Sequence, residues 1–186
     1  MSDFRITPIE VLVVLICLGL ISVLVLPALL ISRAESRSIT CQSHQVQLVL
    51  EIRKPNDPLL IVNPKNWPQS MVLRLNERSH IKHCPSDDRQ PPAIASYGIN
   101  PHISEFIDED GSKISFLDFD ATVVDLNLTE QQRVTRWNQS VAPRHFDFVN
   151  VVFYDSHIET REASKIAPES RSQLNTLWLP GSGQGT

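Results

Sequence analysis

An uncharged apolar run near the N-terminus constrains the fold of this chain more than any other feature of its sequence. Residues 11 to 31 read VLVVLICLGLISVLVLPALLI and include no charged side chain. A helix rises ~1.5 Å per residue, so these 21 residues would span about 32 Å, close to the thickness of a bilayer's hydrocarbon core. We therefore expect a transmembrane helix over residues 11–31.

A cleavable secretory signal is the alternative interpretation of the same run. Such signals carry a basic leader and an apolar core of about 7–15 residues, which is shorter than the run found here. The leader holds Asp3, Arg5 and Glu10 and is nearly neutral, although Ser32 to Ala34 offer a small-x-small cleavage pattern. The length of the run and the charge of the leader favour a retained anchor.

Composition and motifs exclude several classes of protein. The chain of 186 residues carries 17 Lys plus Arg against 21 Asp plus Glu, so it lacks the cationic surplus of a non-specific nucleic-acid binder. It contains none of the GxSxG, HExxH, Walker or GxGxxG patterns of common enzyme classes, and we predict that it is not an enzyme. Its three cysteines include no CxxC pair of the kind that holds structural zinc.

A helical pattern continues beyond the apolar run. Apolar residues recur close to every 3.6 positions, at Ala34, Ile39, Val46, Val49 and Leu50. Lys54-Pro55 ends the pattern, because proline disfavours helix in the residue before it. We expect a short leader over residues 1–5, one helix over 6–54 of about 70 Å, a globular α+β domain over 55–179 and a flexible tail over 180–186.

Strand signals gather in the second half of the chain. Residues 114–119, 122–126 and 149–154 are rich in β-branched and aromatic side chains and are predicted to be strands. The run 149–154 is followed by Asp155-Ser156 and then by residues 157–160, a pattern that predicts a hairpin with a two-residue loop. A small antiparallel sheet is therefore expected.

The N-terminal segment resembles a known processing motif. Arg5-Ile6-Thr7-Pro8-Ile9-Glu10, followed by the apolar run, resembles the N-terminus of type IV prepilins and type II secretion pseudopilins, and Pro27 falls where that family places a proline. The resemblance implies that Ile6 is the first mature residue and that Glu10 is the glutamate used in assembly. Arg5 stands where the family has glycine, so an uncleaved chain, with Arg5 as counter-charge to Glu10, is the alternative.

A second resemblance lies near the C-terminus. His145 and Asp155 are separated by nine residues, as in the H-x9-DG signature of prepilin-type proteins abundant in planctomycetes. Ser156 replaces the signature glycine, and Asp147-Phe148 replace a pair of small residues. An extended strand of roughly 20 Å over 149–154 would separate the two signature residues, so we expect positional roles. His145 would hold a loop carbonyl, and Asp155 would shape a turn.

Cys41 and Cys84 are a candidate disulfide. In an exported domain they would face an oxidising space, where a bridge persists; two buried thiols are the alternative. His80 and His83 lie close to Cys84, but the adjacent His83 and Cys84 are awkward as co-ligands of one zinc ion. Residues 108–112 form an acidic turn that lacks the later glutamate of a calcium loop, although the resemblance to pseudopilins, some of which bind calcium in a late loop, leaves calcium as an alternative. We predict no cofactor and no metal.

Together the two resemblances imply a pilin-like α+β fold, with the long N-terminal helix packed on a small antiparallel sheet. The implied function is that of a structural subunit or accessory of a type II secretion or type IV pilus-like system. Its partners would be the cytoplasmic membrane, crossed once with the C-terminal domain outside, other pilin-like subunits, and prepilin peptidase if the chain is processed. A membrane-anchored exported binding domain that never polymerises is the alternative, and an anchored metal-dependent enzyme is the third hypothesis.

Overall fold

The computed structural model describes residues 7–52, 63–75, 80–89, 94–107 and 110–181. The chain divides into two compact units, residues 1–36 and residues 37–186. Several predicted features lie outside the described residues: the leader over 1–5, Ile6, the end of the predicted helix at 53–54, and most of the tail over 180–186.

Helix α1 covers Pro8–Ile52 and confirms the predicted long N-terminal helix. Its start follows from local chemistry, because proline is favoured at the first helical position. The carboxylate of Glu10 accepts hydrogen bonds from the backbone N–H and the hydroxyl of Thr7 at 2.7 and 2.8 Å, while the Thr7 hydroxyl accepts one from the Glu10 N–H at 3.4 Å. This reciprocal pair is a capping box, which satisfies N–H groups that the first turn leaves free.

The part of α1 in the first unit is apolar and exposed. Its most apolar 18-residue window has a mean hydropathy of 3.1 and no buried residue, which makes it long and apolar enough to cross a membrane. Seventeen large hydrophobic side chains between Ile9 and Ile31 are each 45% to 74% exposed. Pro27 lies inside the helix.

The part of α1 in the second unit has one buried face. Its buried side chains recur at helical spacing, at Cys41, Gln45, Leu48, Val49 and Ile52. Positions spaced by three and four residues share one side of a helix, so this stripe packs into the domain core while the intervening residues stay more exposed.

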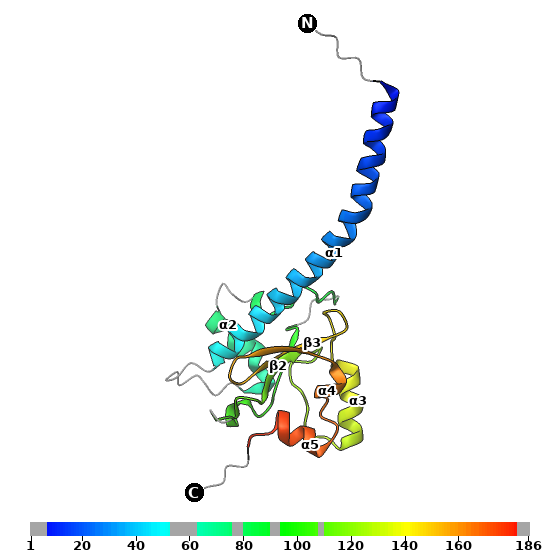
Figure 1. Ribbon diagram of the computed structural model, residues 1–186. Coiled ribbons are helices and arrows are strands. Elements are labelled where there is room, and N and C mark those ends of the chain that lie inside the picture. Colours follow the sequence, from blue (N-terminus) through cyan, green and yellow to red (C-terminus); the bar gives the residue numbers. More distant parts are fainter. Residues whose placement is uncertain (1–6, 53–62, 76–79, 90–93, 108–109, 182–186) are drawn as a thin grey trace. The chain divides into compact units, whose positions relative to one another are not determined.

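The second unit is built on a four-stranded antiparallel sheet, shown in Figure 1. The strands lie in chain order, β1 (Tyr97–Ile99), β2 (Ile114–Asp118), β3 (Val149–Phe153) and β4 (Ile158–Arg161). Residues of β2 and β3 are buried throughout, as expected for central strands covered on both faces. The predicted α+β class and the two predicted strands that became β2 and β3 are confirmed.

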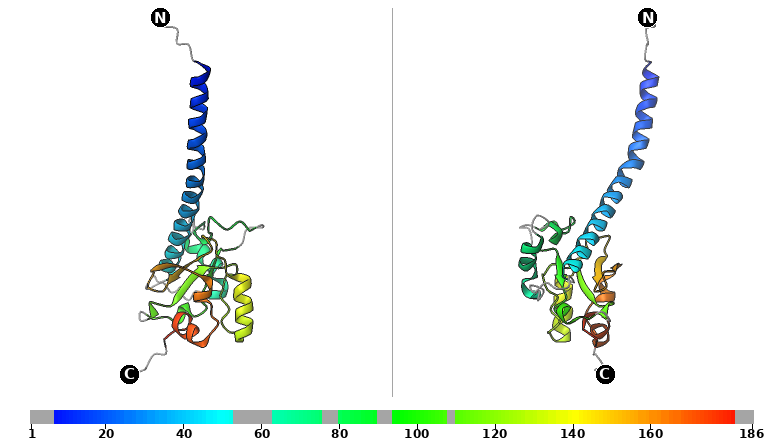
Figure 2. Two further views of the ribbon diagram at one scale, coloured as in Figure 1. Left: turned by 45° about the vertical axis from the view of Figure 1, so that its right-hand side comes forward. Right: turned by 90° about the vertical axis from the view of Figure 1, so that its left-hand side faces the viewer.

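Two hydrophobic clusters lie on opposite faces of the sheet. Phe116 and Val152 join one cluster, with side chains of α1 and of α2 (Trp67–Leu75). Their neighbours in the sequence, Leu117 and Val151, belong to the other cluster, because successive side chains of a strand point to opposite faces of the sheet. That second cluster is completed by α3 (Glu130–Ser140), α4 (Ala163–Ile166) and the segment that runs from α5 (Arg171–Gln173) into a π-helical turn (Leu174–Trp178). Figure 2 shows the part of α1 that belongs to the second unit, residues 37–52, and the C-terminal helices on either side of the sheet.

The predicted strand over 122–126 is wrong. Val123 makes a single parallel bridge with Ile99, and the flanking hydrogen bonds join Ile99 N–H to the Thr122 carbonyl and Val124 N–H to the Ile99 carbonyl, each at 3.0 Å. The indole of Trp67 also donates to the Thr122 carbonyl at 2.6 Å. The segment therefore crosses beside the short edge strand β1 and is held partly by a side chain, instead of continuing a ladder.

The hairpin between β3 and β4 has a three-residue loop, and the predicted two-residue loop is wrong. Phe153 and His157 are the last hydrogen-bonded pair, since the Phe153 N–H donates to the His157 carbonyl at 2.9 Å. The Ser156 N–H donates back to the Phe153 carbonyl at 2.9 Å, and Ser156 has a φ of 75°. A β-turn closed by a left-handed residue is a common three-residue hairpin loop, and glycine is favoured at that last position.

Strand β4 forms one edge of the sheet and carries charged side chains. Its Glu159 forms an ion pair with Arg161, and His157 Nε2 lies 3.6 Å from the Glu159 carboxylate. The Arg161 guanidinium also lies 5.3 Å from the centre of the Phe153 ring. The free edge is therefore lined by paired charges.

A half-buried ion-pair network ties three loops together beside the sheet. Asp87 accepts hydrogen bonds from Arg89, and the Arg144 guanidinium lies 3.4 Å from the same carboxylate. Both arginines also pair with Asp120. Burial alone would raise the pKa of Asp87, but the bonds from Arg89 and the charge of Arg144 outweigh burial and hold this pKa well below its ordinary value.

Ser156→Gly should stabilise the domain by about 1 kcal/mol, because it removes the cost of a left-handed conformation for a residue with a side chain. The measurement is urea unfolding of the full chain in detergent micelles, followed by tryptophan fluorescence; Trp67, Trp137 and Trp178 are all buried in the second unit. Ser112→Gly, at an exposed turn without positive φ, is the control and should not stabilise. Equal effects of the two variants would contradict the prediction.

Asp87→Asn should lower the free energy of unfolding at pH 7 by about 2 kcal/mol, since it removes charge-assisted hydrogen bonds. A carboxyl whose folded pKa is depressed contributes stability above its unfolded pKa of about 4, and this contribution is lost as pH falls further. The variant should therefore differ less from the unchanged chain at pH 3 than at pH 7 in the same unfolding assay. Asp88→Asn, at the exposed neighbouring carboxylate, serves as control; a constant difference for Asp87→Asn would contradict the assignment.

Candidate functional site

The predicted site residues fall into two separate groups. Glu10 and Pro27 lie in the exposed part of α1, whereas Arg5 and Ile6 are outside the described residues. The remaining candidates, Cys41, Cys84, His145 and Asp155, all belong to the second unit. The structure brings three of these four residues together and leaves Asp155 apart.

Cys41 and Cys84 form a disulfide with a Cα–Cα distance of 5.0 Å. Cys41 lies on the buried stripe of α1, and Cys84 lies in the loop that precedes Asp87. Both residues are buried, with exposures of 0% and 3%. The bridge therefore links α1 covalently to a loop that the sheet and the ion-pair network also hold.

His145 and Asp118 complete a buried group around this bridge, which we call the disulfide cluster: Cys41, Cys84, Asp118 and His145. His145 Nε2 lies 3.3 Å from Cys84 Sγ and 3.7 Å from Asp118 Oδ2. Asp118 is the last residue of β2, and both added side chains are almost completely buried. Nε2 of His145 thus faces a sulfur and a carboxylate. That His145 also holds a loop carbonyl stays a prediction.

Asp118 is held rigidly from two directions. Gln45 Nε2 of α1 donates to Asp118 Oδ1 at 3.0 Å, and the Asn150 N–H of β3 donates to Oδ2 at 2.9 Å. Asn150 in turn accepts from Gln42 of α1 at 3.1 Å and from Thr160 of β4 at 3.0 Å. The carboxylate is thus the centre of a polar network that joins the helix to three strands.

Burial shifts the pKa values of two side chains of the disulfide cluster, Asp118 and His145. It raises the pKa of Asp118 to about 7, although hydrogen bonds from Asn150 and Gln45 and the charge of Arg144 act in the opposite direction. Burial, with a smaller effect of Arg144, lowers the pKa of His145 to about 4. The imidazole is therefore neutral near pH 7, and one of its nitrogens has a free lone pair.

A strained turn presents His145 to the cluster. The N–H groups of His145 and Phe148 each donate to the other residue's carbonyl, at 3.4 and 3.0 Å, and the two residues between them, Phe146 and Asp147, have φ values of 54° and 66°. Positive φ at both central positions defines a type I′ turn, which usually contains Asn and Gly. Phe146 is 55% exposed at its tip.

Asp155 lies in the β3–β4 hairpin loop. Its Oδ1 accepts from the His157 N–H at 3.0 Å, and its own N–H donates to the Gly111 carbonyl at 3.2 Å. The nine-residue spacing thus connects one residue in the core with another at a surface loop. His145 and Asp155 do not share a site.

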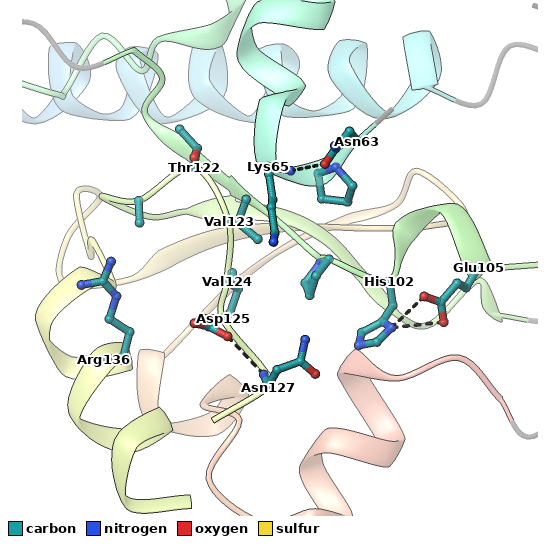
Figure 3. Close-up of a pocket in the computed structure, with 13 residues that line it drawn as sticks. Asn63, Lys65, His102, Glu105, Thr122, Val123, Val124, Asp125, Asn127 and Arg136 are labelled. Carbon is teal, nitrogen blue, oxygen red and sulfur yellow. Dashed lines mark hydrogen bonds and ion pairs between the residues drawn. The ribbon is translucent and has the colours of Figure 1, made fainter. Parts of the chain in front are cut away.

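A pocket of about 660 Å³ lies away from all of these residues, and Figure 3 shows it. Its lining mixes cationic, acidic and apolar side chains, with Lys65 reaching into it and Arg136 projecting from α3. Glu105 holds His102 Nδ1 at 3.1 Å from both carboxylate oxygens. None of the residues singled out as site candidates in the sequence lines this pocket.

Replacing both Cys41 and Cys84 by alanine should lower the free energy of unfolding by about 4 kcal/mol, because the bridge restricts the unfolded chain across a separation of 43 residues. Urea unfolding in detergent micelles, read by tryptophan fluorescence, measures this loss. Cys17→Ala is the matched control, since Cys17 is a free, exposed cysteine in the first unit, and it should change nothing. Unfolding of the double variant at the same urea concentration as the unchanged chain would contradict the prediction.

No protein-family model, no curated protein and no solved structure matches this chain. The resemblance to the prepilin-type proteins therefore rests on sequence motifs alone.

Proposed function

We propose that this protein is a pilin-like structural subunit or accessory of a type II secretion or type IV pilus-like system. It would be anchored in the cytoplasmic membrane by α1, with the second unit outside the cytoplasm. Its partners would be the membrane and other pilin-like subunits, with prepilin peptidase acting if the chain is processed. The observation that carries this proposal is that α1 has an exposed apolar first part and a second part with one face buried in the domain core.

The exposed part of α1 supports an embedded location. Seventeen large apolar side chains at 45% to 74% exposure cannot stay in water at low cost, because apolar surface contributes about 25 cal/mol for each Å² removed from water. Lipid or neighbouring apolar helices would cover this surface equally well. A pilin-like subunit would use both coverings in turn, first in the membrane and then in a filament.

The buried stripe of α1 supports a pilin-like arrangement, in which the second part of the helix packs into the core of the domain. The same continuous helix supplies Cys41, Gln45 and Leu48 to the domain core and is tied there by the disulfide and by the bond to Asp118. Pilins likewise use one long helix whose first half is apolar and whose second half packs on a sheet, and this similarity supports the proposal.

The surroundings of Glu10 support its proposed role in setting the register between neighbouring subunits. Its carboxylate is satisfied locally by Thr7 and stands at the polar start of a helix whose next 21 residues are uncharged. A carboxylate at the boundary of an apolar helix is costly unless a cation or hydrogen-bond donors meet it. In an assembly, a free N-terminal amine at Ile6 would be the cation; in an uncleaved chain, Arg5 would be.

Processing is tested by co-expressing the chain with a prepilin peptidase and sequencing the N-terminus of the membrane-bound product. The proposal expects the mature chain to start at Ile6. An N-terminus at Met1 would weaken the filament role, and a soluble product trimmed after Ala34 would overturn the anchor itself.

Assembly is tested by crosslinking single cysteines placed along α1 in a Cys17→Ser background. A polymer should give contacts between copies that repeat along the helix. Glu10→Gln should abolish most of these crosslinks, whereas Glu35→Gln, at an exposed acidic residue of the same helix outside the apolar run, should preserve them. Membrane-bound chains that form no crosslinks would contradict the polymer.

An anchored binding domain that never polymerises is the second candidate. Two observations favour it, namely Arg5 at the position of the family glycine and the pocket of about 660 Å³ beside Lys65 and Arg136. A retained Met1, together with the absence of crosslinks between copies, would select this candidate.

A further inference from the structure

The disulfide cluster holds four side chains of the types that ligate metals. Among the described residues it is the one group in which three or more such side chains converge, and all four are buried. We propose that the dithiol form of this chain binds one Zn²⁺ ion through Cys41 Sγ, Cys84 Sγ, His145 Nε2 and a carboxylate oxygen of Asp118. This inference concerns the second unit and is independent of whether the chain assembles.

The positions of the donor atoms support coordination. One ligand atom from each of the four residues lies within 4.8 Å of the others. The same ring nitrogen, Nε2, faces both the sulfur of Cys84 at 3.3 Å and the carboxylate of Asp118 at 3.7 Å. A proton relay through histidine needs partners on two different ring nitrogens, whereas a shared metal ion needs its ligands to face one point.

The sulfur atoms need only a local rearrangement. Zinc–sulfur bonds of about 2.3 Å in a tetrahedral site place two thiolates roughly 3.7 Å apart. Bonded sulfurs are closer than this, but once the bond is open a rotation about χ1 of either cysteine separates them without moving the backbone. Oxidation and metal binding therefore exclude one another at this site.

The donor set selects the class of metal. Two thiolates and an imidazole suit zinc and its spectroscopic substitute cobalt, whereas magnesium and calcium prefer oxygen ligands throughout. Gln45 and the Asn150 backbone hold Asp118 by hydrogen bonds of 3.0 and 2.9 Å, which is the support that ligating carboxylates usually receive from outer residues. The ion would join α1, the loop at Cys84, β2 and the turn at His145.

The dithiol form is prepared with a trialkylphosphine. The S–S bond breaks, the phosphine becomes a phosphine oxide with oxygen from water, and the two protons of that water end on the two thiols. Binding of the divalent ion then displaces both thiol protons to the buffer. No other reactant is consumed.

The test is an anaerobic titration of the reduced full chain with Co²⁺ in detergent micelles, in a Cys17→Ser background. We expect one Co²⁺ per chain, with visible bands of tetrahedral cobalt and a near-ultraviolet thiolate-to-cobalt transition, both abolished when Zn²⁺ displaces the cobalt. Zn²⁺ should also slow alkylation of Cys41 and Cys84 by a maleimide. The oxidised chain is the first control and should give none of these signals.

Variants locate the site. His145→Gln and Asp118→Asn should each weaken Co²⁺ binding by at least about tenfold. His83→Gln, next to Cys84 but outside the cluster, should leave the titration unchanged. Tryptophan fluorescence verifies that each variant is folded before its titration is interpreted.

Three results would overturn the proposal. They are a folded, reduced chain without cobalt bands, equal binding by the oxidised chain, and binding that survives both His145→Gln and Asp118→Asn. Loss of binding in His83→Gln alone would assign the metal to a different set of residues and would also overturn it.

Discussion

The second unit depends on the hydrogen bonds that the buried carboxylate of Asp118 accepts. This carboxylate sits at the end of a central strand and receives hydrogen bonds from α1 through Gln45 and from β3 through the Asn150 backbone. An unpaired charge in such a place would cost several kcal/mol, so its partners must keep fixed positions. The side-chain bonds of Asn150 to Gln42 and Thr160 extend the same constraint to β4. Apolar packing could tolerate a slip of α1 along the sheet; this network does not.

Much of the architecture could be predicted from local sequence patterns. These patterns are clear where a whole segment is apolar, as in a long uncharged run or a run of β-branched residues. The uncharged run and its continuation predicted α1 almost to its ends, and β-branched runs predicted β2 and β3. Helix α3 was missed because Glu130–Ser140 is largely polar and buries little besides Trp137. The signal for it was present as a capping box, with Thr129 followed three residues later by Gln132. Strand β1 has only three residues, too few to show a period.

The composition of the disulfide cluster could be predicted from the sequence only in part. Cys41, Cys84 and His145 could each be singled out from the chain, but Asp118 could not be connected with them. It lies inside the run ISFLDF, where one acid among apolar residues is the sole local sign of a special role. Its partners come from α1, β3 and the turn at His145, so contacts across 27 to 73 residues of sequence create the site. The pocket beside Lys65 was missed for the same reason.

The charged edge of the sheet has a consequence for how copies of the chain can meet. Strand β4 ends the sheet and carries Glu159 and Arg161, which form an ion pair, and His157 directly precedes it. A foreign strand pairing there would have to displace these hydrated groups, which is how many proteins protect an open edge. Growth by adding strand to strand is therefore disfavoured at β4. An ordered array of this protein would therefore have to use surfaces other than the β4 edge.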